Sequence, residues 1–218
     1  MKISINPDIK QACPQMRLVC LQAKVKIKST QADLWTKIES TTQEKAQMQM
    51  EEIKDIPAIA ASRNAYKALG KAPSRYRLSA EALHRRIVKG TGLYQISNVV
   101  EIINLTSLIS GFSIGGYDAS KIEGEVALSL GLASDVYEAI GRGILNIENL
   151  PVFRDEISAF GSPTSDSMRT RITEDSRTIL LIFLDFASDD AVFAAVEACK
   201  TLLIEHAAAE EVNLHTVV

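Results

Sequence analysis

Two strand-like runs and three helix-like runs follow one another in the first ninety residues. In the second strand-like run, Lys24, Lys26 and Lys28 alternate with apolar residues, which is the period of a half-exposed β-strand. Gly70 and Gly90 stand where two of the helices would end, because glycine readily adopts the left-handed conformation that closes a helix. The expected elements are strands over residues 1–5 and 17–28 and helices over residues 30–54, 57–69 and 79–89, the last of them capped by Ser79.

The next helix-like run, residues 98–110, is apolar on nearly every side, which is typical of a helix buried between layers. Asn98 and Glu101 have the spacing of a capping box, so the helix is expected to begin there. Glu101, Asn104 and Ser107 recur every three residues and lie along one narrow polar stripe. A buried Asn104 either holds neighbouring backbone in place or faces a wet cavity, and the pattern leaves both possibilities open.

After Gly111 the pattern changes to strands separated by glycines and prolines. The run Thr178–Leu184 is almost wholly apolar and predicts a strand buried on both faces. Helices first, strands later and a helix at the end predict an α+β fold with helices packed on a face of sheet layers. The expected elements are strands over residues 125–130, 136–140, 145–153 and 178–184 and a last helix from Asp189 or Asp190 to about Ala209.

The composition is that of a globular protein: 218 residues, 46% hydrophobic and 23% charged. No apolar run approaches the length that a bilayer requires, and the first residues lack a signal-peptide core, so we expect a cytoplasmic protein with no membrane partner. Cys13, Cys20 and Cys199 lack the close pairing of a zinc site and are expected to be packed, reduced thiols. We therefore expect neither a metal nor a cofactor.

The net charge is only −3, but its distribution is uneven. Residues 63–89 contain eight basic residues and one acidic residue, Glu81, whereas residues 185–218 contain seven acidic residues and one lysine. Such asymmetry steers an anionic partner toward one end of a molecule. The alternative is that both segments are the solvated faces of amphipathic helices.

Three ordered motifs resemble a known family. SRNAYKALGKAPSRYRLSAEALHRRIVKG, ISNVVEIINLTSLISGFSIGGYDASKIEG and RTRITEDSRTILL together resemble the editing domain of the phenylalanyl-tRNA synthetase β subunit, and more closely its free-standing relatives, over about residues 57–207. The resemblance implies a three-layer sandwich of two β-sheet layers with helices on one side. It also implies a single domain, 1–218, in which residues 1–56 supply N-terminal strand and helix elements.

In the synthetase this module accepts the aminoacylated 3′ end of tRNA and hydrolyses a wrongly attached tyrosine. The resemblance therefore implies a tRNA or aminoacyl-tRNA 3′ end and an amino-acid-like small molecule as partners, and not DNA. No ligase core fits within this length. The basic run would supply phosphate contacts, with Tyr66 and Tyr76 available for stacking on unpaired bases. The expected RNA-binding residues are Arg63, Lys67, Arg75, Arg77, Arg85 and Arg86.

The pair Gly115 and Gly116 is expected to form a pocket wall, since two positions without side chains let a ligand approach the backbone. The alternative is a tight turn or bulge before Asp118, whose side chain would cap the residues that follow. Asn104 and Ser107 would supply a polar floor. The expected pocket residues are Asn104, Ser107, Gly115, Gly116, Tyr117, Asp118, Asp166, Arg169 and Thr170.

The stretch SDSMRTRITED, residues 165–175, is the other chemically dense segment. Asp166 would bind an ammonium group and Arg169 a carboxylate or phosphate. The alternative is a polar turn that leads into the buried strand. In the family a histidine occupies the place of Gly115, and a GGEHSG-like segment the place of SDSMRTR, so the family's His and Glu are both missing here.

The catalytic residues are therefore not identified by the sequence. Ester hydrolysis without them would rely on a positioned water molecule and the terminal ribose hydroxyl. Two hypotheses remain: a hydrolase that clears mischarged aminoacyl-tRNA in trans, or a non-catalytic module that binds a free amino acid or a related metabolite. His84, His206 and His215 lie outside the pocket motifs and are expected at the surface.

Overall fold

The buried run near residue 180 forms the central strand of the larger of two main sheets. The computed structural model describes residues 1–218, and in it Thr178–Asp185 is β9, flanked on one side by β2 and on the other by β3. Alternate residues of β9 belong to different cores: Leu181 packs toward the helices and Ile182 toward the second sheet. A strand buried on both faces accounts for a run with no polar alternation.

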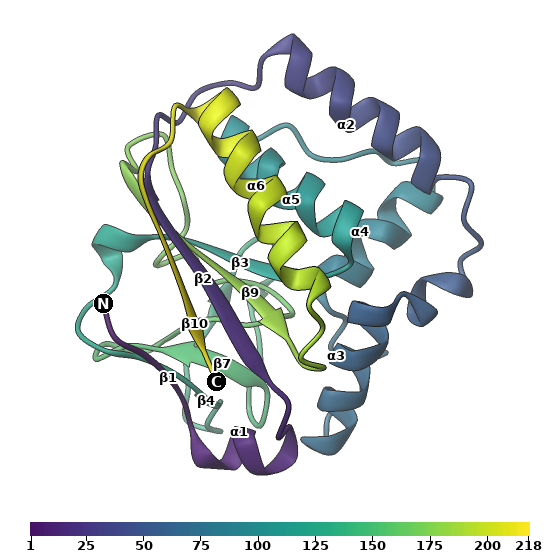
Figure 1. The fold of residues 1–218 in the computed structure, drawn as a ribbon. Helices are drawn as coiled ribbons and strands as arrows, with labels where there is room; N and C mark the ends of the chain where they lie inside the picture. The colour runs from purple at the N-terminus through teal and green to yellow at the C-terminus, as the bar shows by residue number, and fades with distance from the viewer.

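The fold is an α+β sandwich of three layers, as the sequence predicts (Figure 1). One sheet has the order β10-β2-β9-β3, and the other has the order β1-β4-β7-β8. Only β1 and β4 pair in parallel. The strands are β1 (Ile3–Ile5), β2 (Arg17–Lys24), β3 (Ser113–Asp118), β4 (Val126–Leu130), β5 (Glu138–Ala139), β6 (Gly143–Ile144), β7 (Pro151–Arg154), β8 (Ala159–Gly161), β9 and β10 (Glu210–Val217).

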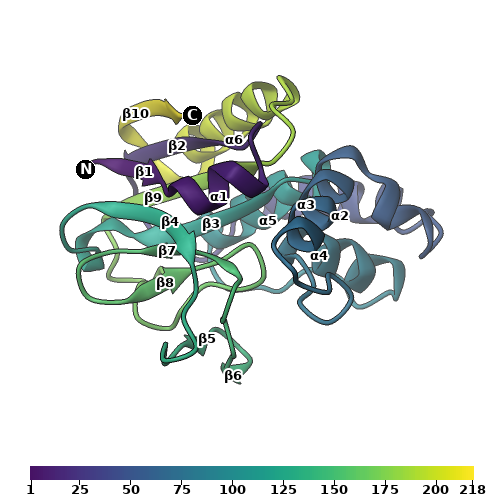
Figure 2. The same ribbon diagram turned by 90° about the horizontal axis from the view of Figure 1, so that it is seen from below.

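Helices α2, α4, α5 and α6 lie on the side of the larger sheet that faces away from the second sheet (Figure 1). The short hairpin β5–β6 projects from the body of the molecule (Figure 2). None of the helices combines the length and the hydrophobicity that crossing a bilayer requires. The helices are α1 (Pro7–Ala12), α2 (Ala32–Lys45), α3 (Pro57–Ala68), α4 (Ser79–Val88), α5 (Asn98–Ser110) and α6 (Ala191–Ala207), with 3₁₀ helices η1 (Glu52–Asp55) and η2 (Ala119–Lys121).

The expectation of one helix over residues 30–54 is wrong for the residues after Lys45. The chain leaves the helix after Lys45 and re-forms only one 3₁₀ turn, η1. Leu34 and Ile38 pack in the core between the helices and the larger sheet, but Ile53 packs in a third core with residues of α3, β5 and β7. A straight helix cannot reach both cores, so the chain bends between them.

Four strands were not expected at all, namely β3, β6, β8 and β10. β10 is exposed on both faces for most of its length, so it has no hydrophobic alternation to reveal it. β3 contains Gly115 and Gly116, and glycine is depleted in strands. Neither glycine has a positive φ, so the pair forms neither a left-handed turn nor a bulge. Two expected strands are also much shorter, since the runs expected over residues 136–140 and 145–153 form only β5 and β7.

The start of α5 differs by one residue from the expected capping box. Ser97 is the cap, and its hydroxyl accepts a hydrogen bond from the backbone N–H of Val100. Glu101 accepts from the N–H of Ile96 at 2.5 Å. Asn98 instead ties three segments together, because its amide group bonds the backbone of Lys28, Lys26 and His206. Ser79, likewise, follows the cap position of α4 and makes no side-chain cap.

Candidate functional site

Gly115 makes room for a side chain of the protein itself. On the face of β3 that looks toward the second sheet, a Cβ at Gly115 would overlap the Tyr117 hydroxyl and lie 2.6 Å from Tyr117 Cζ. A Cβ at Gly161 on β8 would meet the same phenol group. The Tyr117 ring also packs edge-on against Phe160, with ring centroids 4.9 Å apart. The expectation that Gly115 leaves space for a ligand is therefore corrected, since Tyr117 fills that space.

Gly116 faces the opposite side of the sheet. A Cβ there would lie 2.7 Å from Ile103 Cδ1 on α5 and 3.4 Å from Ile172 Cδ1. Asn104 and Ser107 are also on this helix, and Ser107 donates a hydrogen bond of 2.7 Å to the carbonyl oxygen of Phe112. The side chain of Asn104 is half-buried and makes no hydrogen bond within the protein. The larger sheet thus separates Asn104, Ser107 and Gly116 from Gly115 and Tyr117, and these residues do not converge on one pocket.

Asp166 joins the two faces at the edge of β3. Its Oδ1 accepts a hydrogen bond of 2.8 Å from the Tyr117 hydroxyl, and its Oδ2 accepts one of 3.3 Å from the N–H of Gly116. Burial raises the pKa of Asp166 to about 7, although these two donors favour its charged form. Burial and the neighbouring Asp166 carboxylate raise the pKa of Tyr117 well above its ordinary value. The Asp166 carboxylate therefore bonds the protein rather than a ligand in this structure.

The segment Asp166–Thr170 crosses between three strands. The N–H of Ile140 donates to the carbonyl of Asp166, and the N–H of Ser167 donates to that of Phe160, each at 2.9 Å. On the other side, the N–H of Asp118 at the edge of β3 donates to the carbonyl of Thr170 at 2.9 Å. This segment covers a sheet edge that would otherwise be open. These contacts favour the alternative of a polar turn that leads into the buried strand over a site that binds both ends of an amino acid.

Arg169 is held by an ion pair inside the protein. Its Nη2 lies 2.8 Å from Oδ1 of Asp155, whose side chain is fully buried, and its Nη1 donates to the carbonyl of Lys121 at 2.9 Å. Burial alone would raise the pKa of Asp155, but backbone N–H donors at Glu123 and Ser158 and the Arg169 guanidinium outweigh it and lower that pKa. Most of the charge of Arg169 is thus compensated before any ligand arrives.

Thr170 and Asp118 also have structural contacts. Thr170 is fully buried, and its hydroxyl donates to the carbonyl of Phe160 at 3.4 Å. Asp118 caps η2 by accepting from the N–H and the hydroxyl of Ser120, so the expectation that it caps the residues after it is confirmed. Its other oxygen accepts a hydrogen bond of 2.7 Å from the Ser176 hydroxyl. Both side chains hold the region of β3 in place.

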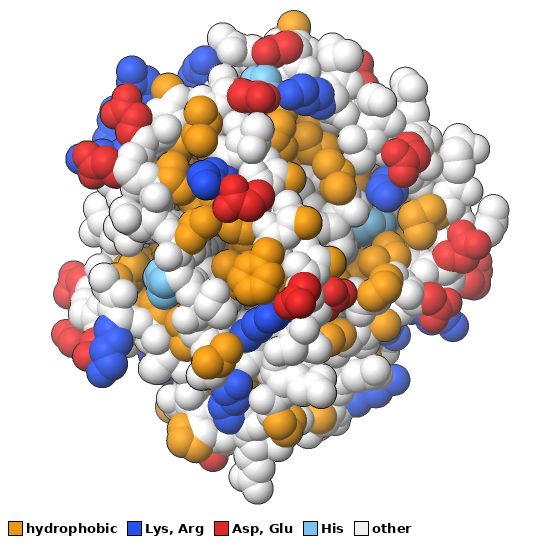
Figure 3. Space-filling view, viewed as in Figure 1, with side chains coloured by type: hydrophobic (Ala, Val, Ile, Leu, Met, Phe, Trp, Pro, Cys, Tyr) orange, Lys and Arg blue, Asp and Glu red, His pale blue; other side chains and the backbone are white.

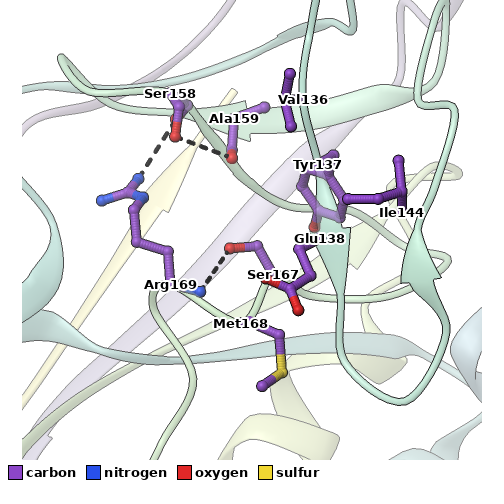
Figure 4. A pocket seen from close by; sticks show the side chains of 9 residues that line it. All are labelled: Val136, Tyr137, Glu138, Ile144, Ser158, Ala159, Ser167, Met168 and Arg169. Carbon is purple, nitrogen blue, oxygen red and sulfur yellow. Dashed lines mark hydrogen bonds between the residues drawn. The ribbon is translucent and has the colours of Figure 1, made fainter.

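A cavity of about 480 Å³ lies beside the crossing segment, next to the hairpin (Figure 4). Arg169 and its two preceding residues form one wall, and Ser158 and Ala159 from the start of β8 form another. Val136 and Ile144 border it and are 83% and 73% exposed, which is unusual for large apolar side chains. The residues that line it are Val136, Tyr137, Glu138, Ile144, Ser158, Ala159, Ser167, Met168 and Arg169. Of the expected pocket residues, only Arg169 lines this cavity.

The basic run forms a surface around one buried acid. The Glu81 carboxylate is 4% exposed and lies 2.7 Å from Nη1 of Arg63. Arg77 and Arg85 approach it only to 3.7 and 3.8 Å, so their donors are not engaged by a hydrogen bond there. Arg86 is different, because its Nε donates to the carbonyl of Gly92 at 2.6 Å and its guanidinium stacks on Tyr94.

Of the six expected RNA-binding residues, Arg63 and Arg86 are therefore tied to the protein. Lys67 and Arg75 are exposed, and Arg75 lies over the ring of Tyr76. Arg77 and Arg85 share the charge of Glu81 with Arg63 at longer range and make no hydrogen bond to it, so with Lys67 and Arg75 they leave net positive charge for an anionic partner. The opposite signs of charge are interspersed on the face shown in Figure 3, around a largely hydrophobic middle.

Thr164 is buried beneath the basic run and connects its helices to the wall of the cavity. Tyr66 is fully buried as well, so the expectation that it stacks on an unpaired base is wrong. The Thr164 hydroxyl lies 2.9 Å from that of Tyr66 on α3, and 3.5 Å from the carbonyl of Tyr76 in the connector before α4. The next residue, Ser165, accepts a hydrogen bond of 2.7 Å from the hydroxyl of Tyr137, which lines the cavity. A short run of the chain thus contacts both features.

The histidines are not where the sequence placed them. His84 and His206 are 2% and 4% exposed, so the expectation of surface positions is wrong for both and holds for His215 alone. Burial lowers the pKa of His84, whose Nδ1 lies 2.9 Å from the carbonyl of Ala80. None of the three lines the cavity. No group of three or more His, Cys, Asp or Glu side chains is arranged to hold a metal ion.

Comparison with known proteins assigns a family to most of this region. The family model described as the B3/4 domain matches residues 61–197. Among solved structures, the chain is similar to an N-terminal fragment of the phenylalanyl-tRNA synthetase β subunit from Pyrococcus horikoshii, with a TM-score of 0.50 and 10% sequence identity. The similarity covers 99% of this chain and 50% of that fragment, so the chain spans about half its length. No curated protein sequence matches the chain.

Proposed function

The chain belongs to the B3/4 domain family, which includes the editing domain of the phenylalanyl-tRNA synthetase β subunit, and from this membership we propose that it is a stand-alone aminoacyl-tRNA editing-like domain. In this proposal it binds the 3′ end of a mischarged aminoacyl-tRNA and hydrolyses the ester in trans. Water adds to the ester carbonyl, the bond to the ribose oxygen breaks, and the ribose oxygen takes the proton. The products are a free amino acid and uncharged tRNA. Residues 1–218 would form this one domain.

The observation on which the proposal depends is the junction at Thr164. RNA phosphates bound to Lys67, Arg75, Arg77 and Arg85 would place the strand on α3, α4 and their connector. Thr164 contacts Tyr66 and Tyr76 there, and the residues after it form a wall of the cavity. These contacts join the helices of the basic surface to the cavity wall, and the cavity has a size suitable for an aminoacyl group, because ligand pockets usually enclose roughly 300–1,000 Å³.

The chemistry in this proposal depends on positioning rather than on a strong protein base. The cavity is lined by hydroxyl groups of Ser158 and Ser167 and by the carboxylate of Glu138, and no histidine is present. These groups orient a water molecule, and the terminal ribose hydroxyl of the substrate assists the proton transfer. Asp166 does not line the cavity. Its bonds to Tyr117 and Gly116 hold the adjoining wall, which makes it a positioning residue.

A second candidate is a non-catalytic module that binds a free amino acid or a related small metabolite in the same cavity. Asp166 is bonded to Tyr117, and Arg169 is paired with Asp155. Neither side chain is therefore available for catalysis, which favours this second candidate. Amino-acid binding would then depend on the exposed apolar rim, Val136 and Ile144, and on the serine hydroxyl groups.

The proposal is tested by incubating the protein with a panel of mischarged tRNAs, Tyr-tRNA(Phe) among them, and following loss of the ester. Val136→Trp places a large ring at the rim of the cavity and should reduce turnover by roughly tenfold or more, because access and orientation are lost. Leu132→Trp is the matched control. Leu132 is also an exposed apolar residue of the same segment, but it does not line the cavity.

Deacylation that is absent across the panel would exclude the hydrolase. Amino-acid titrations that raise the melting temperature of the protein, and that do not affect Val136→Trp, would then support the binding module. Deacylation that Val136→Trp leaves unchanged would place the reaction outside this cavity.

A further inference from the structure

A second hollow, of about 290 Å³, lies apart from the cavity described above. It is formed where the connection between β2 and α2 meets the start of α5. Its wall contains the indole of Trp35 and the side chains of two connecting segments. The lining residues are Ser29, Thr30, Trp35, Gln95, Ile96 and Glu101.

Two oxygen atoms in this wall are buried and have no hydrogen-bond partner. Glu101 is 1% exposed; its Oε1 accepts from the N–H of Ile96 at 2.5 Å, and its Oε2 accepts from nothing. The hydroxyl of Thr30 is buried without a partner as well. Buried polar atoms are nearly always hydrogen-bonded, so two unpartnered oxygens in the wall of one hollow indicate a missing donor.

The charge of the lining residues indicates what kind of donor fits. Glu101 is the only ionisable side chain among them, and Ser29, Thr30 and Gln95 add oxygen acceptors. No lysine, arginine or histidine lines the hollow to compensate the carboxylate. Burial raises the pKa of Glu101, against the effect of the Ile96 N–H, which reflects the same lack of compensating charge.

A metal ion fits this arrangement poorly. Calcium and magnesium prefer several oxygen ligands that carry more than one negative charge between them. Only one carboxylate is present, and no cluster of metal-binding side chains lies here. An organic cation is favoured instead, because the indole face of Trp35 attracts cations as well as apolar chains.

We propose that this hollow binds a small primary ammonium ion, whose N–H groups donate to Oε2 of Glu101 and to the hydroxyl of Thr30 while its alkyl chain packs against Trp35. Both oxygens have almost no accessible area in this structure, so the side chains around them must shift slightly when the ligand binds. A small head group requires the least movement, and a primary ammonium is therefore preferred to a quaternary one. A free α-amino acid is disfavoured, because its carboxylate would lie near Glu101 with no basic side chain to pair with it. The site is thus distinct from the amino-acid cavity.

Trp35 is the only tryptophan of the chain, so its fluorescence reports on this hollow alone. The probes are n-butylamine, which is cationic at neutral pH; 1-butanol, which is its neutral analogue; and norvaline, which is butylamine with an α-carboxylate. Butylamine should produce a saturable change, with a dissociation constant roughly tenfold or more below that of either other probe. 1-Butanol lacks the charge-assisted hydrogen bond, and the carboxylate of norvaline is repelled by Glu101.

Glu101→Gln keeps an oxygen that accepts from the N–H of Ile96 but removes the charge, and it should weaken butylamine binding by roughly tenfold or more. Thr30→Val should weaken it less. Glu39→Gln is the matched control, because Glu39 is exposed on the same helix as Trp35 and lies outside the hollow. Amide shifts of Ile96, measured by NMR, provide a readout that does not depend on fluorescence.

Equal binding of butylamine and 1-butanol, or unchanged butylamine binding in Glu101→Gln, would overturn the proposal. So would the absence of any saturable change at Trp35 and Ile96. None of these results depends on tRNA or on deacylation, so failure here leaves the proposed function untouched.

Discussion

The hydroxyl of Tyr117 donates a hydrogen bond of 2.8 Å to Oδ1 of Asp166, and this contact joins the core between the sheets to the segment beside the cavity. Tyr117 is fully buried among Phe153 and Phe160, and its hydroxyl reaches the edge of β3 only because Gly115 and Gly161 leave room for the ring. One carboxylate at a strand edge thus sets both the position of a core tyrosine and the course of the crossing segment.

The raised pKa of Asp166 predicts that the protein loses stability as the pH rises toward neutrality. The folded state holds the carboxyl proton up to a pKa of about 7, whereas an unfolded aspartate releases it near about 3.9. The folded state therefore binds more protons at Asp166 between these values, and the contribution of Asp166 to stability is highest below the lower one. This loss, on the order of 4 kcal/mol from the pKa difference, should be complete above the folded pKa.

Asp166→Asn removes the titrating carboxyl group. Comparison with the wild type therefore isolates the contribution of Asp166 to the pH dependence of stability. Urea unfolding from pH 5 to pH 8.5 should show wild-type stability falling relative to Asp166→Asn, so that the variant is the more stable of the two only at the upper end. Carboxylates with lowered pKa values, such as Asp155, titrate below this range and affect both proteins alike. A stability difference that stays constant with pH would show that Asp166 is charged throughout.

Gly115 and Gly116 predict unequal costs for the same substitution at neighbouring positions. An alanine methyl at Gly115 would overlap the Tyr117 ring, which Phe160 and Phe153 hold in place. At Gly116 its one short contact would be with Cδ1 of Ile103, the end of a flexible side chain. Gly115→Ala should cost about 2 kcal/mol or more and Gly116→Ala about 1 kcal/mol or less.

Denaturant unfolding of both variants checks this order. A Gly115→Ala, Tyr117→Leu double variant should cost less than the sum of the single variants, because leucine vacates the space that the methyl requires. Equal costs at the two glycines would show that the Tyr117 ring adapts freely.

The sequence predicted the layers of this fold better than it predicted the contacts of the site. β9 and α5 were predicted because burial on all sides leaves a long apolar run, a signal that is local in the chain. The role of Gly115 was not predictable, since it depends on where the ring of Tyr117 meets Gly161 after two sheets have packed. The stretch SDSMRTR was correctly identified as polar, but its partners lie far away in the chain, at Tyr117 and Asp155.

The pairing of charged residues was equally hard to predict, because it also depends on the tertiary fold. Residues 63–89 were expected to present their cations to solvent, and the sequence could not tell which of them pair inside the protein. Glu81 was visible as a lone acid, yet its burial and its ion pair with Arg63, which joins α4 to α3, depend on the tertiary fold. The Arg86 guanidinium donates hydrogen bonds to two carbonyl groups of the loop that follows α4, so it is not available to a partner.

Arginine side chains that hydrogen-bond within the protein and those that do not predict different effects on RNA binding. Replacing Arg75, Arg77 and Arg85 by glutamine should weaken binding of single-stranded RNA and lower the slope of log affinity against log salt by about 2, because up to three phosphate contacts are lost. Arg86→Gln should leave that slope nearly unchanged and lower the melting temperature instead. Filter-binding titrations at several salt concentrations measure both slopes. Equal slopes for wild type and the triple variant would remove these residues from the interface.

Asn98 and Asn104 lie on the same helix and predict opposite outcomes for removal of an amide. Asn98 is fully buried and bonds the backbone of Lys28 at 3.0 Å, Lys26 at 3.0 Å and His206 at 2.8 Å, so Asn98→Ala leaves three backbone groups without their partner. Its cost should be roughly 2–4 kcal/mol. Asn104 has no such bonds, and Asn104→Ala should change stability by about 0.5 kcal/mol or less.

Thermal and urea unfolding of the two variants, with hydrogen exchange at Lys28 as a local readout, test this difference. Asn98→Ala should release protection at Lys28 because the Asn98 carbonyl oxygen accepts from that N–H. Asn104→Ala serves as the control for loss of an asparagine from α5. If Asn104→Ala proved as destabilising as Asn98→Ala, the half-buried amide of Asn104 would have a structural partner after all, and the link from α5 to β2 and α6 would not depend on Asn98 alone.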